Sequence, residues 1–243
     1  RIIPNIPDGS FLLPLLEHSI RPSDIHNPPT RLICLENTHN FCQGSPLNPE
    51  YMDSVRALAA KYGLKIHLDG ARLFNAAVAQ DINVKDLTRQ ADSVMFCLSK
   101  GLSAPVGSLV CSNRDFIQRA RKFRKMEGGG MRQAGHLAAA GLVALESLVE
   151  RLKEDHQNTQ LLAEQLASVE GIELDPAQVK TNIIFFKLKH SKIDGESFLN
   201  LLEENSIKIL MTDPGVFRAV LHREINREQV ETIAKTVRSI LTL

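Results

Sequence analysis

Residues 65–72, with the sequence KIHLDGAR, decide the fold of this chain. The first four residues predict a buried strand, the Asp-Gly pair predicts a turn, and residues 71–79 predict a helix. The same order of strand and helix recurs before and after this stretch. Strands that alternate with helices form a mostly parallel sheet whose faces the helices cover. We therefore expect an α/β fold.

The predicted elements follow this alternation along the first part of the chain. Residues 1–30 hold six prolines and are expected to be mostly irregular, apart from an apolar patch at 11–16. After them, the patterns predict strands at 31–35, 65–68, 93–98 and 106–111, and helices at 48–62, 71–79 and 115–124.

The second part of the chain predicts a small α+β unit. After Gly128, Gly129 and Gly130, apolar residues recur every three or four positions toward Leu166, which indicates one long amphipathic helix. Asn226 and Gln229 then have the spacing of a capping box that opens the last helix. We place the boundary after residue 145. The other predicted elements are a strand at 182–188, a helix at 195–204, and strands at 207–211 and 217–221.

Composition excludes several classes of protein. The chain has 243 residues, with 29 Lys plus Arg and 28 Asp plus Glu, so its net charge is +1 and favours neither nucleic acid nor a membrane surface. Its apolar runs stop far short of the roughly 20 residues that span a bilayer. The four cysteines lack metal-like spacing, so we expect buried free thiols and a soluble, cytoplasmic protein without a metal site.

Two charged side chains end neighbouring strands of the predicted sheet. Asp69 follows one strand, and Lys100 follows the next, between Ser99 and Gly101. Open α/β sheets bind ligands beyond the carboxyl ends of their strands. A desolvated lysine there can form a Schiff base, and a carboxylate can keep a pyridine nitrogen protonated, which is the pair that pyridoxal phosphate requires. Alone, Asp69 could be a helix N-cap and Lys100 a solvated surface group.

Two further arginines could bind a carboxylate. Arg72 lies three residues after Asp69, and Arg218 lies in a short apolar strand, where an arginine is less common than on a solvated face. A guanidinium at either place could grip a carboxylate through two parallel hydrogen bonds.

Arg132 and His39 complete the candidate site. Arg132 follows residues 128–130, where bare backbone N–H groups at a helix start would suit a phosphate, although the glycines could equally form a plain turn. His39 follows the strand at 31–35 and could act as a general base, stack on an aromatic ring or have a merely structural role.

Four motifs together resemble one enzyme family. They are LENTHN at 35–40, HLDGAR at 67–72, LSKGL at 98–102 and GGGMRQ at 128–133. In this order they resemble the low-specificity L-threonine aldolases, pyridoxal-phosphate enzymes of the aspartate-aminotransferase fold, fold type I. The similarity runs from about residue 31 to the C-terminus. It implies that residues 1–145 are the C-terminal portion of the large PLP-binding domain and that residues 146–243 are the small α+β domain.

The resemblance also implies how the cofactor is held. Lys100 would form the Schiff base, its neighbour Ser99 would also contact the cofactor, and Asp69 would pair with the pyridine nitrogen. Arg132 would reach the phosphate. The family's glycine-rich phosphate segment is not found in residues 1–30, so we expect the chain to lack the N-terminal part of the large domain.

The implied reaction is cleavage of L-threonine or allo-threonine to glycine and acetaldehyde. Arg72 and Arg218 would contact the cofactor or the substrate carboxylate, and His39 would lie near the substrate hydroxyl. The family further implies a homo-oligomer, either a dimer or a tetramer. Two alternatives remain open at this point. One is another PLP-dependent lyase or transaminase, and the other is an inactive truncated form that acts only in subunit assembly.

Overall fold

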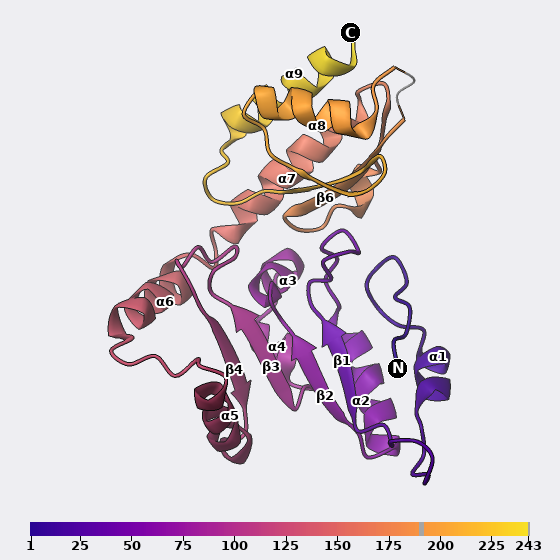
Figure 1. Cartoon of the computed structure of the whole chain (residues 1–243), viewed down its shortest axis with the longest axis vertical. Coiled ribbons are helices and arrows are strands. Elements are labelled where there is room, and N and C mark those ends of the chain that lie inside the picture. The colour runs from indigo at the N-terminus through magenta and orange to yellow at the C-terminus, as the bar shows by residue number, and fades with distance from the viewer. Residues whose placement is uncertain (190–191, 243) are drawn as a thin grey trace. The chain divides into compact units, whose positions relative to one another are not determined.

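A computed structural model describes residues 1–189 and 192–242 of the chain (Figure 1). It contains two compact units. The first comprises Arg1–Cys42 and Pro46–Glu150, and the second comprises Gln43–Ser45 and the chain from Arg151 onward. The division thus falls between Glu150 and Arg151, whereas we placed it after residue 145.

The first unit contains a four-stranded mixed sheet. Its strand order is β1-β2-β3-β4, in which β1, β2 and β3 run parallel and β4 runs antiparallel to β3. All four strands lie within two residues of their predicted positions. They are β1 (Leu32–Glu36), β2 (Lys65–Asp69), β3 (Ser93–Cys97) and β4 (Ser108–Ser112).

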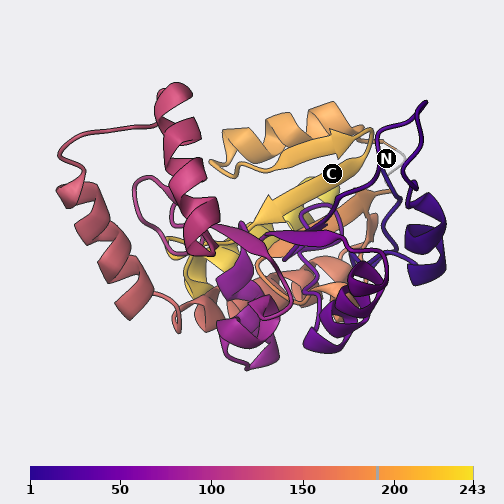
Figure 2. The same cartoon turned by 90° about the horizontal axis from the view of Figure 1, so that it is seen from below.

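Helices follow the strands of this unit as the sequence patterns predict. Asn48 and Asn113 accept backbone N–H groups at the starts of α2 and α5, which explains where these two helices begin. Figures 1 and 2 both place α5 and α6 at the β4 end of the sheet, with α1 at the β1 end. The helices are α1 (Leu13–Ser19), α2 (Pro49–Lys61), α3 (Leu73–Gln80), α4 (Val84–Thr88), α5 (Arg114–Met126) and α6 (Gly135–Ser147).

The cysteines are not buried, so that prediction was wrong. Cys34 and Cys111 are exposed, and Cys42 and Cys97 are half-buried. In β1 the buried positions alternate, so Ile33 and Leu35 enter the core while Cys34 points to the opposite face. The apolar run of β1 is therefore buried on one face of the strand and exposed on the other.

The glycine triplet at 128–130 ends a helix rather than opening one. Gly128 has a φ of +82° and donates its N–H to Lys125 O, and Gly129 donates to Arg124 O at 2.8 Å. These two bonds form the Schellman motif that closes α5. The next helix, α6, begins only at Gly135.

The predicted long helix is two helices. α6 ends at Ser147, and α7 (Leu152–Ala167) begins in the second unit. The apolar residues that recur every three or four positions do not set the buried face of α6, because Leu142 is 58% exposed while the small residues Gly141 and Ala144 are buried. A Cβ atom on Gly141 would lie 2.9 Å from Leu98 Cδ1, so α6 packs closely through this glycine.

The second unit is an antiparallel sheet with helices. Its strand order is β5-β6-β8-β7. Phe186, Phe198 and Phe217 form an aromatic cluster in its core, with ring centroids 5.1 to 6.4 Å apart. The predicted capping box of Asn226 and Gln229 is confirmed. The elements are α7, β5 (Ile172–Glu173), η1 (Pro176–Gln178), β6 (Ile183–Leu188), α8 (Gly195–Glu204), β7 (Leu210–Asp213), β8 (Val216–Val220) and α9 (Arg227–Leu241).

Candidate active site

The ends of three strands are aligned at one edge of the first sheet. Glu36, the last residue of β1, is the register partner of Asp69, the last residue of β2, and Asp69 is in turn the partner of Met95 in β3. Backbone hydrogen bonds of 2.8 Å continue the alignment, from Asn37 N to Asp69 O and from Gly70 N to Met95 O. Side chains that follow these strands therefore share one rim.

Asp69 presents an exposed carboxylate at this rim. Its Oδ1 accepts the backbone N–H of Ala71 at 3.0 Å, which orients the side chain. It does not cap α3, because Arg72 occupies that position without a side-chain cap bond. The helix N-cap alternative is therefore wrong, and the carboxylate stays accessible to a ligand.

Lys100 lies at the tip of a folded turn beyond β3. Backbone hydrogen bonds from Leu98 N to Gly107 O and from Ala104 N to Leu98 O close the turn. The side chains of Leu98, Leu102 and Ala104 are buried. Lys100 and the neighbouring Ser99 are exposed. The expectation that burial in this chain desolvates Lys100 is therefore wrong, because only the apolar residues of the turn are buried.

Arg72 follows Asp69 by three residues and is half-buried. Burial lowers the pKa of its guanidinium, and the nearby carboxylates of Glu36 and Asp69 oppose that shift. Glu36 and Asp69 are therefore within electrostatic reach of Arg72. A partly desolvated guanidinium binds an anion more strongly than a solvated one does.

His39 faces Glu36 across the same rim. Its Nε2 atom is 3.6 Å from Glu36 Oε2, and 13% of the His39 side chain is exposed. Its Nδ1 atom is buried and has no hydrogen-bond partner among residues 1–189 and 192–242. Sequence reasoning missed Glu36. The signal was present, since Glu36 ends β1 just as Asp69 ends β2.

Two predicted site residues, Arg132 and Arg218, do not lie at the aligned strand ends. Arg132 is exposed in the segment between α5 and α6. Arg218 belongs to the second unit, where β8 places it between Phe185 of β6 and Leu210 of β7. Their roles stay predictions.

The rim offers part of what pyridoxal phosphate requires. An accessible carboxylate for the ring nitrogen and an accessible amine for the aldehyde are both present, at Asp69 and Lys100. The expected phosphate cradle is absent at Gly128 and Gly129, since their N–H groups donate to carbonyls of α5. Among the predicted residues, Arg132 and Ser99 are left as candidates to contact the phosphate.

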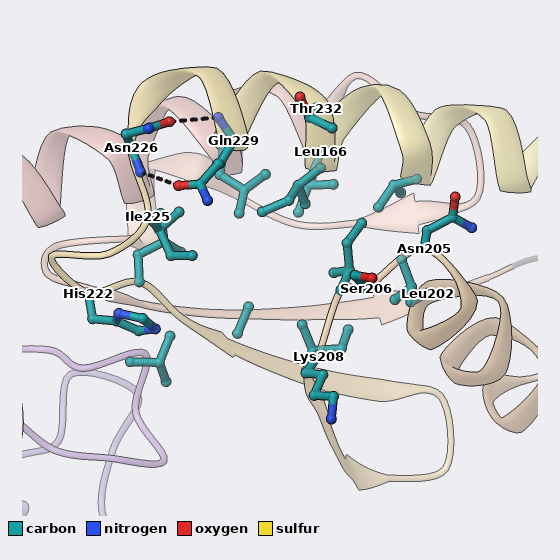
Figure 3. A pocket seen from close by; sticks show the side chains of 18 of the residues that line it. Leu166, Leu202, Asn205, Ser206, Lys208, His222, Ile225, Asn226, Gln229 and Thr232 are labelled. Atoms are coloured by element: carbon teal, nitrogen blue, oxygen red, sulfur yellow. Dashed lines mark hydrogen bonds between the residues drawn. The ribbon is translucent and has the colours of Figure 1, made fainter.

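A cavity of about 510 Å³ lies in the second unit, beneath α9 (Figure 3). It includes none of the seven predicted site residues. Three of its polar side chains are engaged locally, since Asn226 and Gln229 bond each other's backbone N–H groups and Thr232 donates to Glu228 O. Apolar side chains such as Leu166 and Leu202 form its walls. We assign no ligand to it.

Comparison with known proteins identifies the family. Residues 2–189 match the family described as Beta-eliminating lyase. The chain belongs to this β-eliminating lyase family. Within it, the chain is 43% identical to the probable low-specificity L-threonine aldolase 2 of Arabidopsis thaliana, over 96% of this chain and 66% of that one. It is 42% identical to the low specificity L-threonine aldolase of Escherichia coli (strain K12), over 96% and 67%.

The chain therefore spans about two thirds of the length of these lyase relatives. The resemblance to low-specificity L-threonine aldolases that the four motifs indicated is confirmed.

Solved structures share the fold of this chain. A putative L-allo-threonine aldolase from Listeria monocytogenes EGD-E has a TM-score of 0.78 at 18% identity, covering 96% of this chain and 66% of that one. The threonine aldolase of Leishmania major has a TM-score of 0.75 at 18% identity, covering 97% and 69%. The expected α/β architecture of PLP fold type I is confirmed.

Within the described ranges, no helix combines the length and the apolar character needed to cross a bilayer. In the same ranges, His, Cys, Asp and Glu side chains form no group of three that could bind a metal ion.

Proposed function

We propose that this chain cleaves the Cα–Cβ bond of L-threonine and L-allo-threonine, with pyridoxal phosphate as cofactor, to give glycine and acetaldehyde. One observation carries the proposal: the exposed Asp69 ends β2 directly beside β3, the strand that leads to Lys100. Identity of 42–43% to proteins named as threonine aldolases supports this choice of substrate.

Four residues of the chain would hold the cofactor. Lys100 would bind its aldehyde carbon, Asp69 would keep its ring nitrogen protonated, and Ser99 and Arg132 would contact its phosphate side. When bound, pyridoxal phosphate supplies an electron sink for the pair that remains when the Cα–Cβ bond breaks.

The other rim residues act on the substrate. Arg72, which is partly desolvated, would bind and orient the substrate carboxylate, and Arg218 of the second unit is the other candidate for this role. His39 would take the proton of the β-hydroxyl. Loss of that proton lets the oxygen electron pair form the carbonyl of acetaldehyde as the Cα–Cβ bond breaks. A cytoplasmic location and a homo-oligomeric state belong to the same proposal and stay predictions.

The proposal is tested by product analysis. The chain is incubated with pyridoxal phosphate and L-threonine, and glycine, acetaldehyde and 2-oxo acids are quantified. We expect glycine and acetaldehyde in equal amounts, and loss of both in Lys100→Ala. A 2-oxo acid without acetaldehyde would instead indicate a transaminase. Product that appears only when intact subunits of a relative are added would indicate a role in assembly.

A further inference from the structure

Three residues of the loop after β1 belong to the second unit. The loop leaves the first unit at Cys42 and returns to it at Pro46, with Gln43–Ser45 between them. Gln43 has a φ of +59°, where a residue with a side chain is uncommon, and Gly44 has a φ of +66°. A non-glycine residue in this conformation persists where surrounding contacts compensate its cost. The contacts come from β6 and from the residues just before it.

The Gln43 side chain binds one edge of β6. Its Oε1 atom accepts the backbone N–H of Phe185 at 3.0 Å. The register of β5 with β6 covers Lys187 and Leu188, so the N–H of Phe185 lies outside that pairing. A buried backbone N–H without an acceptor costs free energy comparable to a lost hydrogen bond. Gln43 therefore takes the place of a neighbouring strand at this point of β6.

Gly44 holds the loop close to β6. Its carbonyl oxygen accepts the buried hydroxyl of Thr181 at 2.7 Å. A Cβ atom on Gly44 would lie 2.5 Å from Thr181 Oγ1 and 3.2 Å from Ile183 Cβ. The hydroxyl cannot rotate away without losing its hydrogen bond, so this position requires glycine. The close approach keeps the neighbouring Gln43 at the edge of the strand.

Phe185 connects this contact to Arg218, one of the predicted site residues. The two are register partners across β6 and β8. Hydrogen-bonded and non-hydrogen-bonded pairs alternate in an antiparallel ladder. Since Phe185 gives its N–H to Gln43, it forms a non-hydrogen-bonded pair with Arg218, the arrangement in which the two side chains lie closer. The placement of Arg218 on β8 therefore depends on where Gln43 holds Phe185.

From these contacts we infer that Gln43 is a positioning residue, which holds β6 so that β8 presents Arg218 to the substrate carboxylate. The contact with β6 rests on the geometry alone, while the carboxylate as ligand of Arg218 rests on the proposed function. The acceptor oxygen of Gln43 carries the role. A side chain of similar length without that oxygen should fail, and one that keeps it should succeed.

NMR of the labelled chain tests the contact directly. In Gln43→Met, the Phe185 amide should exchange about 10-fold faster, as expected when one hydrogen bond is lost. The Nε–H signal of Arg218, assigned with Arg218→Lys, should shift in the same variant. Gln43→Glu keeps an acceptor oxygen and should retain the protection of Phe185. The matched control is Gln157→Met, which changes an exposed glutamine of α7.

Three NMR results would overturn the inference. They are unchanged exchange of the Phe185 amide in Gln43→Met, an unchanged Arg218 signal in that variant, and equal loss of protection in Gln43→Glu. Gly44→Ala tests the close approach and should also speed exchange at Phe185. Gly63→Ala should not, because Gly63 has a similar φ of +63° but no atom within 4 Å of its added Cβ. Equal exchange at Phe185 in these two glycine variants would refute the role of Gly44.

Kinetics connect the contact with substrate binding. Gln43→Met should raise KM for L-threonine about 3- to 10-fold with kcat changed less than about two-fold, because a contact made equally in the ground and transition states affects binding alone. A lower kcat with unchanged KM would contradict this role. The NMR results do not depend on turnover, so an inactive chain with the expected exchange and shift would refute the proposed function and leave the Gln43 contact standing.

Discussion

Replacing Gly70 with alanine tests how closely β2 and β3 must approach to build the rim. A Cβ atom at this position would lie 2.7 Å from Met95 O and 3.0 Å from Leu73 Cβ. The first of these atoms is backbone, so it cannot rotate away as a side chain would. The strand ends must separate, and the bond from Gly70 N to Met95 O at 2.8 Å is then lost.

The expected cost follows from three contributions. Overpacking costs about 1 to 3 kcal/mol, a lost backbone hydrogen bond costs about 0.5 to 1.5 kcal/mol, and the lower entropy of the unfolded alanine chain returns about 0.4 to 1 kcal/mol. The sum is a loss of about 2 kcal/mol in the free energy of unfolding. Separation of the strands also moves Asp69 away from Lys100, so retention of pyridoxal phosphate should fall as well.

Hydrogen exchange measures this loss locally, which suits a chain of two units. Peptides that cover β2 and β3 should exchange about 30-fold faster in Gly70→Ala, the factor that corresponds to about 2 kcal/mol. The control is Gly135→Ala, where the added Cβ meets no atom within 4 Å and protection should not fall. Unchanged exchange of the β2 and β3 peptides in Gly70→Ala would refute this reasoning.

Two acidic residues give predictions about pH. Hydrogen bonds from Arg56, Ile66 N and Lys65 outweigh burial and lower the pKa of Asp92 to about 2, so its contribution to stability is present above pH 4 and is lost as the pH falls through 2. Asp92→Asn should therefore lower the urea midpoint at pH 7 but not at pH 2. Burial raises the pKa of Asp155 to about 6, against the opposing charge of its ion-pair partner Arg151. The contribution of the protonated Asp155 carboxyl to stability is full below pH 4 and is lost as the pH rises through 6. The NMR signal of this carboxyl should therefore titrate with a midpoint near pH 6.

The rim could be predicted because its signals are local. An apolar strand that ends in Asp69, and another that leads to Lys100, place both side chains at one edge once the strands are parallel. Parallel pairing itself follows from the intervening helices. For this reason, the position of the rim follows from the sequence.

The predictions that failed concern features that depend on long-range packing. The thiol of Cys34 was expected to be buried, but the apolar run of β1 faces the core only at alternate residues. The glycines at 128–130 looked like a phosphate loop, but which helix they belong to depends on hydrogen bonds to α5. Glu36 went unselected because its closeness to His39 and Arg72 depends on strand register and loop geometry.

The central claim is that Lys100 and Asp69 form a pyridoxal-phosphate site, and covalent fixation tests it most directly. The chain is incubated with pyridoxal phosphate and reduced with borohydride, and the modified lysine is located by peptide mass spectrometry. We expect modification at Lys100 that is stoichiometric in the wild type and strongly reduced in Asp69→Ala, with no compensating site in Lys100→Ala. Stoichiometric modification of another lysine, or equal modification in Lys100→Ala, would contradict it.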